Sequence, residues 1–485
     1  MKKLTHVLLA LIISIITVVG LTGGHSVHAA TDTSLQKVED KGYIVMGTSP
    51  DYPPYEFLSK NKVVGMDVEV GKRIAQDLGV KLKVKQMDFD QLLVALETGK
   101  VDMVISGMSP TSERAKHVDF SKVYYKGGQN IIVNKADAKL YAKGKSSLTG
   151  KKVGAQTGSL QQTLAKKQIK NSQVTGLAKT TDLLLDLKSH KVDAVVLEKP
   201  VADAYAANDA SLTSIDGHFD LGSDMQGTAI GFAKGSDALV NKVNKTIDKI
   251  NKGNLTDGYL KTAATYMKTN TKNTSMLAYW KVFGKGVWYT IFISLVAVVF
   301  GVLGGIIFAL MRLSKSKVLH GIAVAYIEFI RGTPLMIQVM FVYFGIGMVV
   351  SIPALVSGII AVAINSSAYV AEIFRSGINS IPVGQTEAAR SLGLSQRETM
   401  QSVVLPQALK NIWPALGNEF VSLIKESSIV SIIGVTDLIY QLKVVQTDTY
   451  KGVAPIAVAM VLYFIMTFTL SKILNHFEGK MKHEG

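Results

Sequence analysis

Four places in the first half of the sequence carry side chains with the chemistry to hold a small zwitterion. Tyr52 follows a strand-like run, and small residues with bare backbone follow another at Ser106–Ser109. Arg114 begins the next helical stretch, and its planar guanidinium group matches a carboxylate. Glu198 ends the apolar run VDAVVLE, where its carboxylate is available to an ammonium group. We therefore predict a ligand site that complements both charges of an amino acid.

Strand-like and helical segments alternate around these residues. The order strand, helix, strand, helix, strand occupies about 43–106, and a similar order recurs at about 151–197. Such alternation is typical of parallel βαβ units, in which ligands bind at the carboxyl ends of strands and at helix N-termini. We predict a two-lobed α/β receptor domain at 31–268. The expected bounds are about 42–130 with 228–268 for lobe 1, and about 134–220 for lobe 2.

Two crossing segments are expected to join the lobes. We place the first crossing near Ile131–Asn134 and the return near Gly227–Phe232. A ligand between the lobes is then trapped by hinge closure. If one lobe binds the carboxylate and the other binds the ammonium group, only the closed form satisfies both charges, so the ligand favours closure.

A resemblance to the polar amino-acid-binding proteins of ATP-binding-cassette importers (solute-binding family 3) rests on five segments. They read GTSPDYPPYEF, GMDVEVGKRIA, MDFDQLLVALETGKVDMVISGMSPTSERAKHVDFSKVYY, GKKVGAQTGS and KVDAVVLEKPVADAY. The similarity runs from about Gly42 to Met267. It implies a two-lobed receptor of the periplasmic-binding-protein type that binds a polar amino acid.

The resemblance also implies a role for individual residues. Tyr52 and Phe89 sandwich the ligand side chain, and Glu198 binds the α-amino group. The α-carboxylate is held by Gly107, Ser109 and Arg114. The other residues of the implied pocket are Ser49, Ser106, Met108, Gln156 and Ser159. Ser49 stands where many relatives have Asp, and Gln156 stands where glutamine binders often have Lys, so the resemblance leaves open which polar amino acid binds.

Long apolar runs dominate the second half of the chain. Each approaches or exceeds the ~20 residues that a helix needs to cross a bilayer. They lie at roughly 288–311, 319–346, 352–374, 412–435 and 453–474. We predict a linker at 269–285 and an all-α transmembrane domain of about five helices at 286–478, with Pro334 and Pro414 as helix breaks. Polar residues in or beside the runs are expected to face the bundle interior; these are Arg331, Asn365, Glu372, Asn418, Glu419, Lys425 and Glu426.

The N-terminus and the loop charges predict a multi-pass cell-membrane protein with an extracellular binding domain. Residues 1–30 combine a basic start, an apolar run and small residues before Ala30, as in a cleaved signal peptide; an uncleaved anchor is the alternative, and it exports the same domain. Loops assigned to the cytoplasm hold most of the positive charge, in accordance with the positive-inside rule. They carry Arg312, Lys315, Lys317, Arg375, Arg390, Arg397, Lys480 and Lys482, whereas the outer loops carry only Lys443 and Lys451.

The polar segment at 382–406, PVGQTEAARSLGLSQRETMQSVVLP, interrupts the apolar runs. It matches the EAA signature of importer permeases, with Val403 in place of the usual Ile. The signature residues are Glu387, Ala388, Ala389, Gly393, Leu405 and Pro406. The two alanines give a helix of low profile, Gly393 permits a reversal, and Pro406 is expected to end the helix that leads to it. The resemblance implies that this segment couples the permease to a separate cytoplasmic ATPase.

Composition and missing motifs narrow the function further. The net charge of +16 fits a protein held against anionic lipid, and no basic stripe interleaved with aromatic residues predicts nucleic-acid binding. The chain has no cysteine and no G-x-x-x-x-G-K-[ST], H-E-x-x-H or G-x-S-x-G motif. We therefore expect no catalytic residue, metal or cofactor in this chain, and ATP bound by a partner subunit.

Two other functions are compatible with a receptor fold joined to membrane helices. A ligand-gated channel related to ionotropic glutamate receptors inserts its pore between the binding lobes, whereas here both lobes end before the first apolar run. An enzyme on the same fold needs catalytic groups in the cleft, and only binding residues are visible. Because five spans are too few to enclose a path, the importer interpretation predicts a permease dimer, a homodimer in the first instance, with a heterodimer as the alternative.

Overall fold

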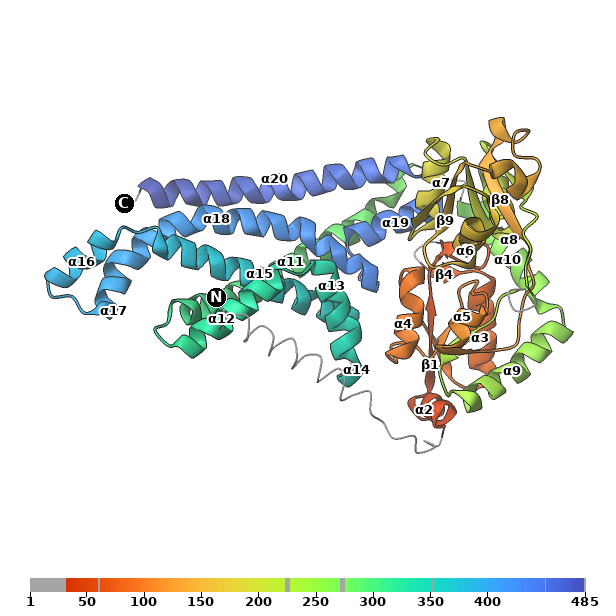
Figure 1. Cartoon of the computed structure of the whole chain (residues 1–485), viewed down its shortest axis with the longest axis horizontal. Helices are drawn as coiled ribbons and strands as arrows, with labels where there is room; N and C mark the ends of the chain where they lie inside the picture. Colours follow the sequence, from red (N-terminus) through yellow and green to blue (C-terminus); the bar gives the residue numbers. More distant parts are fainter. Residues whose placement is uncertain are drawn as a thin grey trace.

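The computed structural model describes residues 32–59, 62–222, 227–270, 275–350, 352–449 and 451–483. An α/β receptor lies at one end of a set of long helices, which run side by side away from it (Figure 1). The predicted signal peptide at 1–30 lies outside the described residues. The predicted linker at 269–285 is helical at both ends, because α10 (Leu255–Asn270) reaches into it and α11 begins at Trp280.

Lobe 1 is built on a five-stranded sheet with the order β5-β1-β6-β13-β7. β1 pairs in parallel with β5 and β6, whereas β13 is antiparallel to its neighbours. The strands are β1 Tyr43–Thr48, β5 Lys81–Gln86, β6 Met103–Val104, β7 Val118–Phe120 and β13 Gly231–Ala233. The helices are α2 Ser34–Lys41, α3 Met66–Asp77, α4 Leu92–Glu97, α5 Ser112–Ala115, α9 Asp237–Lys252 and α10. A small second sheet is formed by β2 Asp51–Tyr52, β3 Glu56–Ser59 and β4 Lys62–Val64.

Lobe 2 has its own five-stranded sheet, with the order β10-β9-β11-β8-β12. β9 pairs in parallel with β10 and β11, and β8 is antiparallel to β11 and β12. The strands are β8 Gln129–Asn134, β9 Lys152–Gln156, β10 Gln173–Leu177, β11 Ala194–Glu198 and β12 Leu212–Asp216. The helices are α6 Leu160–Gln168, α7 Thr180–Lys188 and α8 Lys199–Asn208. Both lobes are therefore α/β, as predicted.

The first crossing between the lobes does not lie at Ile131–Asn134, so that prediction was wrong. These residues belong to β8, an inner strand of the lobe 2 sheet, and the side chains of 131–133 are completely buried. A run so apolar forms a core strand in preference to a connection. The chain crosses before it, between β7 and β8, where Tyr125 forms an isolated antiparallel bridge with Thr228 of the return segment. The hinge is therefore centred on this bridge.

The second half contains three straight helical stretches that are long and apolar enough to cross a membrane, within the described part of the chain. They are Met276–Leu313, Ala354–Asn379 (α15) and Val453–Gly479. The first is mostly α11 (Trp280–Leu313), and the last belongs to α20 (Val453–His483). Two further pairs qualify only as broken spans: Lys317–Arg331 with Leu335–Val349, bent by 105°, and Gln396–Ile433 with Leu438–Thr449, bent by 56°. The five predicted segments are thus three straight helices and two broken ones.

The breaks show which predicted prolines interrupt a helix. Pro334 lies at the first break, between α12 (Lys317–Arg331) and α13 (Leu335–Met340), as predicted. Pro414 does not break a helix, because it lies inside the continuous α18 (Leu405–Glu426). The second break comes instead at Gly434, which has a φ of +80° and ends the helical turn η8 (Ser427–Ile433). A left-handed glycine redirects the chain there at little steric cost.

Candidate ligand site and coupling segment

The predicted ligand residues gather where the two lobes face each other. Lobe 1 supplies Ser49, Tyr52, Phe89, Ser106, Gly107, Met108, Ser109 and Arg114, and lobe 2 supplies Gln156, Ser159 and Glu198. All except Gly107 and Arg114, which are partly exposed, have at most 9% of their surface exposed. The structure therefore brings the whole predicted set into one closed cleft.

Tyr52 and Glu198 meet across this cleft. Glu198 ends β11 and precedes α8, and its backbone N–H donates to the Tyr52 hydroxyl at 3.1 Å. The ring of Tyr52 stacks against Tyr55, with 5.9 Å between the ring centroids. Gly107 has a φ of +52°, and a Cβ added to it would lie 3.3 Å from the Tyr52 ring. The aromatic wall and the bare backbone of lobe 1 thus pack closely beside the carboxylate of lobe 2.

Arg114 also reaches from lobe 1 to lobe 2. It lies in the short helix α5, whose first turn is capped by Thr111. Its Nη1 donates to the carbonyl oxygen of Ser109 at 2.8 Å, and its Nη2 donates to that of Gly158 at 2.9 Å. The guanidinium carbon lies 5.4 Å from the centroid of the Phe89 ring. Two backbone carbonyls and one aromatic face therefore fix the orientation of the guanidinium group.

The N-terminus of α6 forms the facing wall of lobe 2. Ser159 caps this helix, because its hydroxyl accepts from the N–H of Gln162 at 3.1 Å and donates to the carbonyl of Gln156 at 2.6 Å. The side-chain amide of Gln156 donates to the carbonyl of Ala178 at 3.1 Å. The positive end of the helix dipole favours a negative group in front of it.

Burial perturbs both charged groups of the site. It raises the pKa of Glu198 to about 8 and lowers the pKa of Arg114 to about 10. Among the described residues, Glu198 Oε2 has no hydrogen-bond partner. A buried carboxylate without a donor is costly unless it takes up a proton or meets a cation. The ammonium group of an amino acid supplies such a cation.

Sequence analysis missed a second set of contacts that joins the lobes beside the site. Asp51 Oδ2 accepts from the N–H of Thr180 at 2.8 Å, and the Asp51 carbonyl accepts from the Tyr205 hydroxyl at 2.9 Å. Lys179 Nζ lies 3.6 Å from Asp51 Oδ1 and donates to the Ser49 hydroxyl at 3.1 Å. The Ser49 hydroxyl in turn donates to Asp51 Oδ1 at 2.8 Å. No motif signals this set, because its members lie on opposite lobes and far apart in sequence.

Two buried carboxyl groups, also missed, support the loop that carries Ser106 and Gly107. Ser106 Oγ donates to Glu56 Oε1 at 2.7 Å, and the N–H of Gly107 donates to Asp67 Oδ2 at 2.8 Å. Burial raises the pKa of Asp67 to about 6 and that of Glu56 well above its ordinary value. The loop is therefore held from behind by groups that do not face the ligand.

The segment predicted to couple to an ATPase lies at the end of the long helices remote from the receptor (Figure 1). α16 (Val383–Ser391) carries Glu387, Ala388 and Ala389; the first two are exposed, and Ala389 is buried. Gly393, with a φ of +88°, follows α16 and redirects the chain toward α17 (Gln396–Thr399).

Pro406 does not end the helix that leads to it, so that prediction was wrong. The turns of α17 continue through a π-helical stretch, η7 (Met400–Val404), into α18, and Pro406 occupies the first turn of α18. Proline is tolerated in the first turn of an α-helix, where its missing N–H is not needed. The wider π-turn precedes it, and such turns are frequent at functional sites.

The polar residues of the apolar segments lie at cavities or in pairs. Arg331, Asn365, Lys425 and Glu426 line a polar cavity of about 720 Å³. The remaining three are placed as follows: Glu372 lies 2.7 Å from Arg312, Glu419 accepts from Ser366 at 3.3 Å, and Asn418 lines a second cavity of about 150 Å³. These placements agree with the expectation that the groups avoid lipid.

Comparison with known proteins places both halves. Residues 44–262 match the model of bacterial extracellular solute-binding proteins, family 3, and residues 301–483 match that of the binding-protein-dependent transport system inner membrane component. The second half is 38% identical over 199 residues to a putative glutamine transport system permease of Rickettsia typhi, covering 41% of this chain and 91% of that protein. The first half is 37% identical over 212 residues to the arginine-binding extracellular protein ArtP of Bacillus subtilis, covering 43% of this chain and 81% of that protein.

A solved structure is similar to the first half. It is an amino-acid ABC transporter substrate-binding protein from Streptococcus pneumoniae bound to L-arginine, 36% identical, with a TM-score of 0.46, covering 48% of this chain and 98% of that one. The family models and the relatives are transport components, and they support neither a channel nor an enzyme. The chain therefore belongs to the amino-acid importers of the ATP-binding-cassette type, as a solute-binding protein of family 3 fused to its permease.

Proposed function

We propose that this chain captures a polar amino acid outside the cell, with arginine and glutamine as the first candidates, and passes it inward through a permease that a separate ATPase drives. The observation that carries the proposal is the placement of Arg114 and Glu198. These two buried groups come from opposite lobes and carry the charges that complement a carboxylate and an ammonium group. Closure around a zwitterion satisfies both groups, whereas closure without one leaves Glu198 buried without a cation.

The walls of the cleft support a polar ligand side chain. Ser49 and Gln156 offer a hydroxyl and an amide, and both are buried beside the aromatic rings of Tyr52 and Phe89. Neutral polar groups next to aromatic faces suit both a guanidinium and an amide side chain. The two named relatives concern arginine and glutamine, which makes these amino acids the first to test.

The permease half supports a path driven from outside this chain. The coupling segment exposes Glu387 and Ala388 at the end remote from the receptor, where a soluble ATPase has access to them. The positive charges of the sequence put this end in the cytoplasm and the receptor outside. Because the described part of one chain offers at most five spans, we propose that two copies form the path as a homodimer. No cofactor is assigned to the chain, and ATP is bound by the partner ATPase.

Calorimetric titration of residues 30–268 with all twenty amino acids tests the receptor assignment. We expect binding of one or a few polar amino acids with a dissociation constant on the order of micromolar, equivalent to about 8 kcal/mol. Absence of binding for all twenty, by a segment that unfolds cooperatively on heating, would refute the assignment.

A further inference from the structure

The receptor contacts the permease at points where the permease has glycine in place of a side chain. A Cβ added to Gly434 would lie 2.2 Å from the carbonyl oxygen of Gln86, and one added to Gly452 would lie 1.9 Å from Cδ2 of Leu185. A Cβ added to Gly347 would lie 2.2 Å from Nζ of Lys100. Side chains do not fit at these distances. We call Gly347, Gly434 and Gly452 the glycine seats.

The seats receive different lobes of the receptor. Gln86 ends β5 and Lys100 follows α4, so both belong to lobe 1. Leu185 lies in α7 and belongs to lobe 2. Two seats therefore hold lobe 1 and one seat holds lobe 2, and all three are occupied at once in this structure.

A single helix fixes the spacing between the seats of the two lobes. α19 (Leu438–Thr449) begins four residues after Gly434 and ends three residues before Gly452. Its 12 residues span about 18 Å. Because a helix does not change its length readily, the positions at which lobe 1 and lobe 2 can rest on the permease are fixed relative to one another.

Contacts along α19 follow the same division between the lobes. Near its start, the hydroxyl of Tyr440 donates to the side-chain oxygen of Gln86, and Lys443 Nζ lies 3.8 Å from Asp88 Oδ2. Both partners are in lobe 1. Near its end, Gln446 donates to the carbonyl of Gly452 at 3.2 Å and thereby holds the lobe 2 seat in place.

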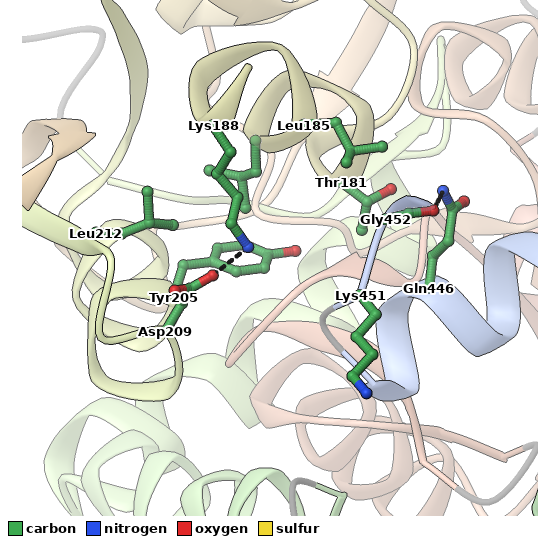
Figure 2. Close-up of a pocket in the computed structure, with 10 residues that line it drawn as sticks. Thr181, Leu185, Lys188, Tyr205, Asp209, Leu212, Gln446, Lys451 and Gly452 are labelled. Carbon is green, nitrogen blue, oxygen red and sulfur yellow. Dashed lines mark hydrogen bonds and ion pairs between the residues drawn. The ribbon is translucent and has the colours of Figure 1, made fainter. Parts of the chain in front are cut away.

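Figure 2 shows the lobe 2 seat from close by. Gln446 and Gly452 line one side of a narrow crevice, and Thr181 and Leu185 of α7 approach them from the receptor. Leu185 reaches toward Gly452, so the contact is made by an apolar side chain against bare backbone. A contact of this kind is lost when the two surfaces separate by about 1 Å.

The lobe 1 seat at Gly347 holds a buried cation. Lys100 is 7% exposed, and its Nζ has no hydrogen-bond partner within the described ranges. Its Nζ lies 4.9 Å from the ring centroid of Tyr343, in the π-helical stretch η6 (Phe341–Ile346). A lysine that loses its water without an anion is placed by the fit of the surfaces around it, since the ring face alone offers weak attraction.

The receptor that fills the seats is closed. Lys179 of lobe 2 lies 3.0 Å from Asp88 of lobe 1, and Arg114 of lobe 1 donates to Gly158 of lobe 2. Opening about the Tyr125–Thr228 hinge would move Leu185 relative to Gln86. The permease can then hold one lobe or the other in its seat, but not both.

We infer that the glycine seats and α19 together form a gauge of receptor closure, to which the receptor docks fully only when lobe 2 has closed on lobe 1. The inference rests on the proposed function, because an amino acid is the ligand that brings about closure. It assigns to α19 a part in distinguishing loaded from empty receptors. An empty, open receptor is held at one lobe only and is released easily.

Cysteine cross-linking of the full-length chain in lipid nanodiscs tests this inference, and the absence of native cysteine makes the test clean. One variant carries Leu185→Cys with Gly452→Cys for lobe 2, and another carries Gln86→Cys with Tyr440→Cys for lobe 1. Each is oxidised with and without saturating arginine or glutamine, and the single-cysteine chains serve as controls. We expect the amino acid to raise the yield of the lobe 2 cross-link at least fivefold. Equal yields with and without amino acid, or no cross-link in either condition, would overturn the inference.

A seat variant provides the second arm. Gly452→Leu fills the lobe 2 seat, whereas Gly321→Leu makes the same change at a glycine of α12 that has no neighbouring atom within 4 Å. We expect Gly452→Leu to lower the amino-acid-dependent yield of the Gln86–Tyr440 cysteine pair at least fivefold and Gly321→Leu to leave it unchanged. An unchanged yield in Gly452→Leu would contradict the gauge. Calorimetry on the same proteins separates the two levels: bound amino acid with unresponsive cross-links refutes the gauge alone, whereas no amino-acid binding refutes the proposed function.

Discussion

Replacing Glu198 by glutamine removes the charge of the proposed ammonium site and keeps its size. Glu198 is 2% exposed, and burial raises its pKa to about 8. Removing one partner of a buried charge pair costs about 3–5 kcal/mol. We take about 3 kcal/mol, the lower end, because glutamine keeps an acceptor oxygen. At 1.4 kcal/mol for each factor of ten, we expect Glu198→Gln to bind its amino acid roughly 150-fold more weakly.

The assay is calorimetric titration with the amino acid and with its analogue that lacks the α-amino group. We expect the parent receptor to prefer the amino acid by roughly the same 150-fold, and Glu198→Gln to lose most of this preference, because the charge that reads the ammonium group is gone. Glu39→Gln makes the same change at an exposed carboxylate of α2 and is the matched control. If Glu198→Gln keeps the full preference for the amino compound, Glu198 does not bind the ammonium group and the assignment of the site fails.

Three further predictions test other parts of the account. The pKa of Glu198 in the closed empty receptor is about 8, above its ordinary 4.5, so protonation favours that form and its contribution to stability is present below pH 4.5 and lost as pH rises through 8. Ligand-free Glu198→Gln should therefore gain thermal stability relative to the parent between pH 4.5 and 8 and nothing beyond, and a difference independent of pH would contradict this. Arg114→Lys cannot reach both Ser109 and Gly158, so we expect binding weaker by about 2 kcal/mol, roughly 30-fold; titration with the amino acid and its methyl ester should show reduced discrimination, and full discrimination would exclude Arg114 as the carboxylate ligand. Glu387→Lys reverses an exposed charge of the coupling segment, and we expect it to abolish ATP-driven uptake while leaving amino-acid binding unchanged; uptake equal to that of the parent would argue against the coupling role.

The sequence was sufficient to find the ligand residues because each follows a strand or begins a helix. Glu198 ends an apolar run and Ser159 precedes a helical one, so both could be placed at an edge of a sheet without knowledge of the fold. The contacts that join the lobes could not be found in this way. Asp51 and Thr180 are separated by 129 positions, and only the folding of both lobes around one hinge brings them together.

Local patterns were also ambiguous where a neighbouring segment decides the outcome. The run at Ile131–Asn134 has the composition of a core strand, and its place inside the lobe 2 sheet depends on pairing with β11 and β12. Pro414 and Pro406 looked alike as helix breakers, yet the first is accommodated inside α18 and the second in its first turn. Proline restricts the backbone locally, and the packing around it determines whether the helix ends.

The central claim is that a receptor for a zwitterion and a permease without a motor of its own share this polypeptide. Uptake of radiolabelled arginine or glutamine into proteoliposomes tests it most directly, with the purified chain reconstituted alone and with a candidate cassette ATPase. We predict concentrative uptake only when the partner and ATP are both present, and no ATP hydrolysis by the chain alone. Uptake or an ion current elicited by the amino acid in the absence of the ATPase would contradict the claim.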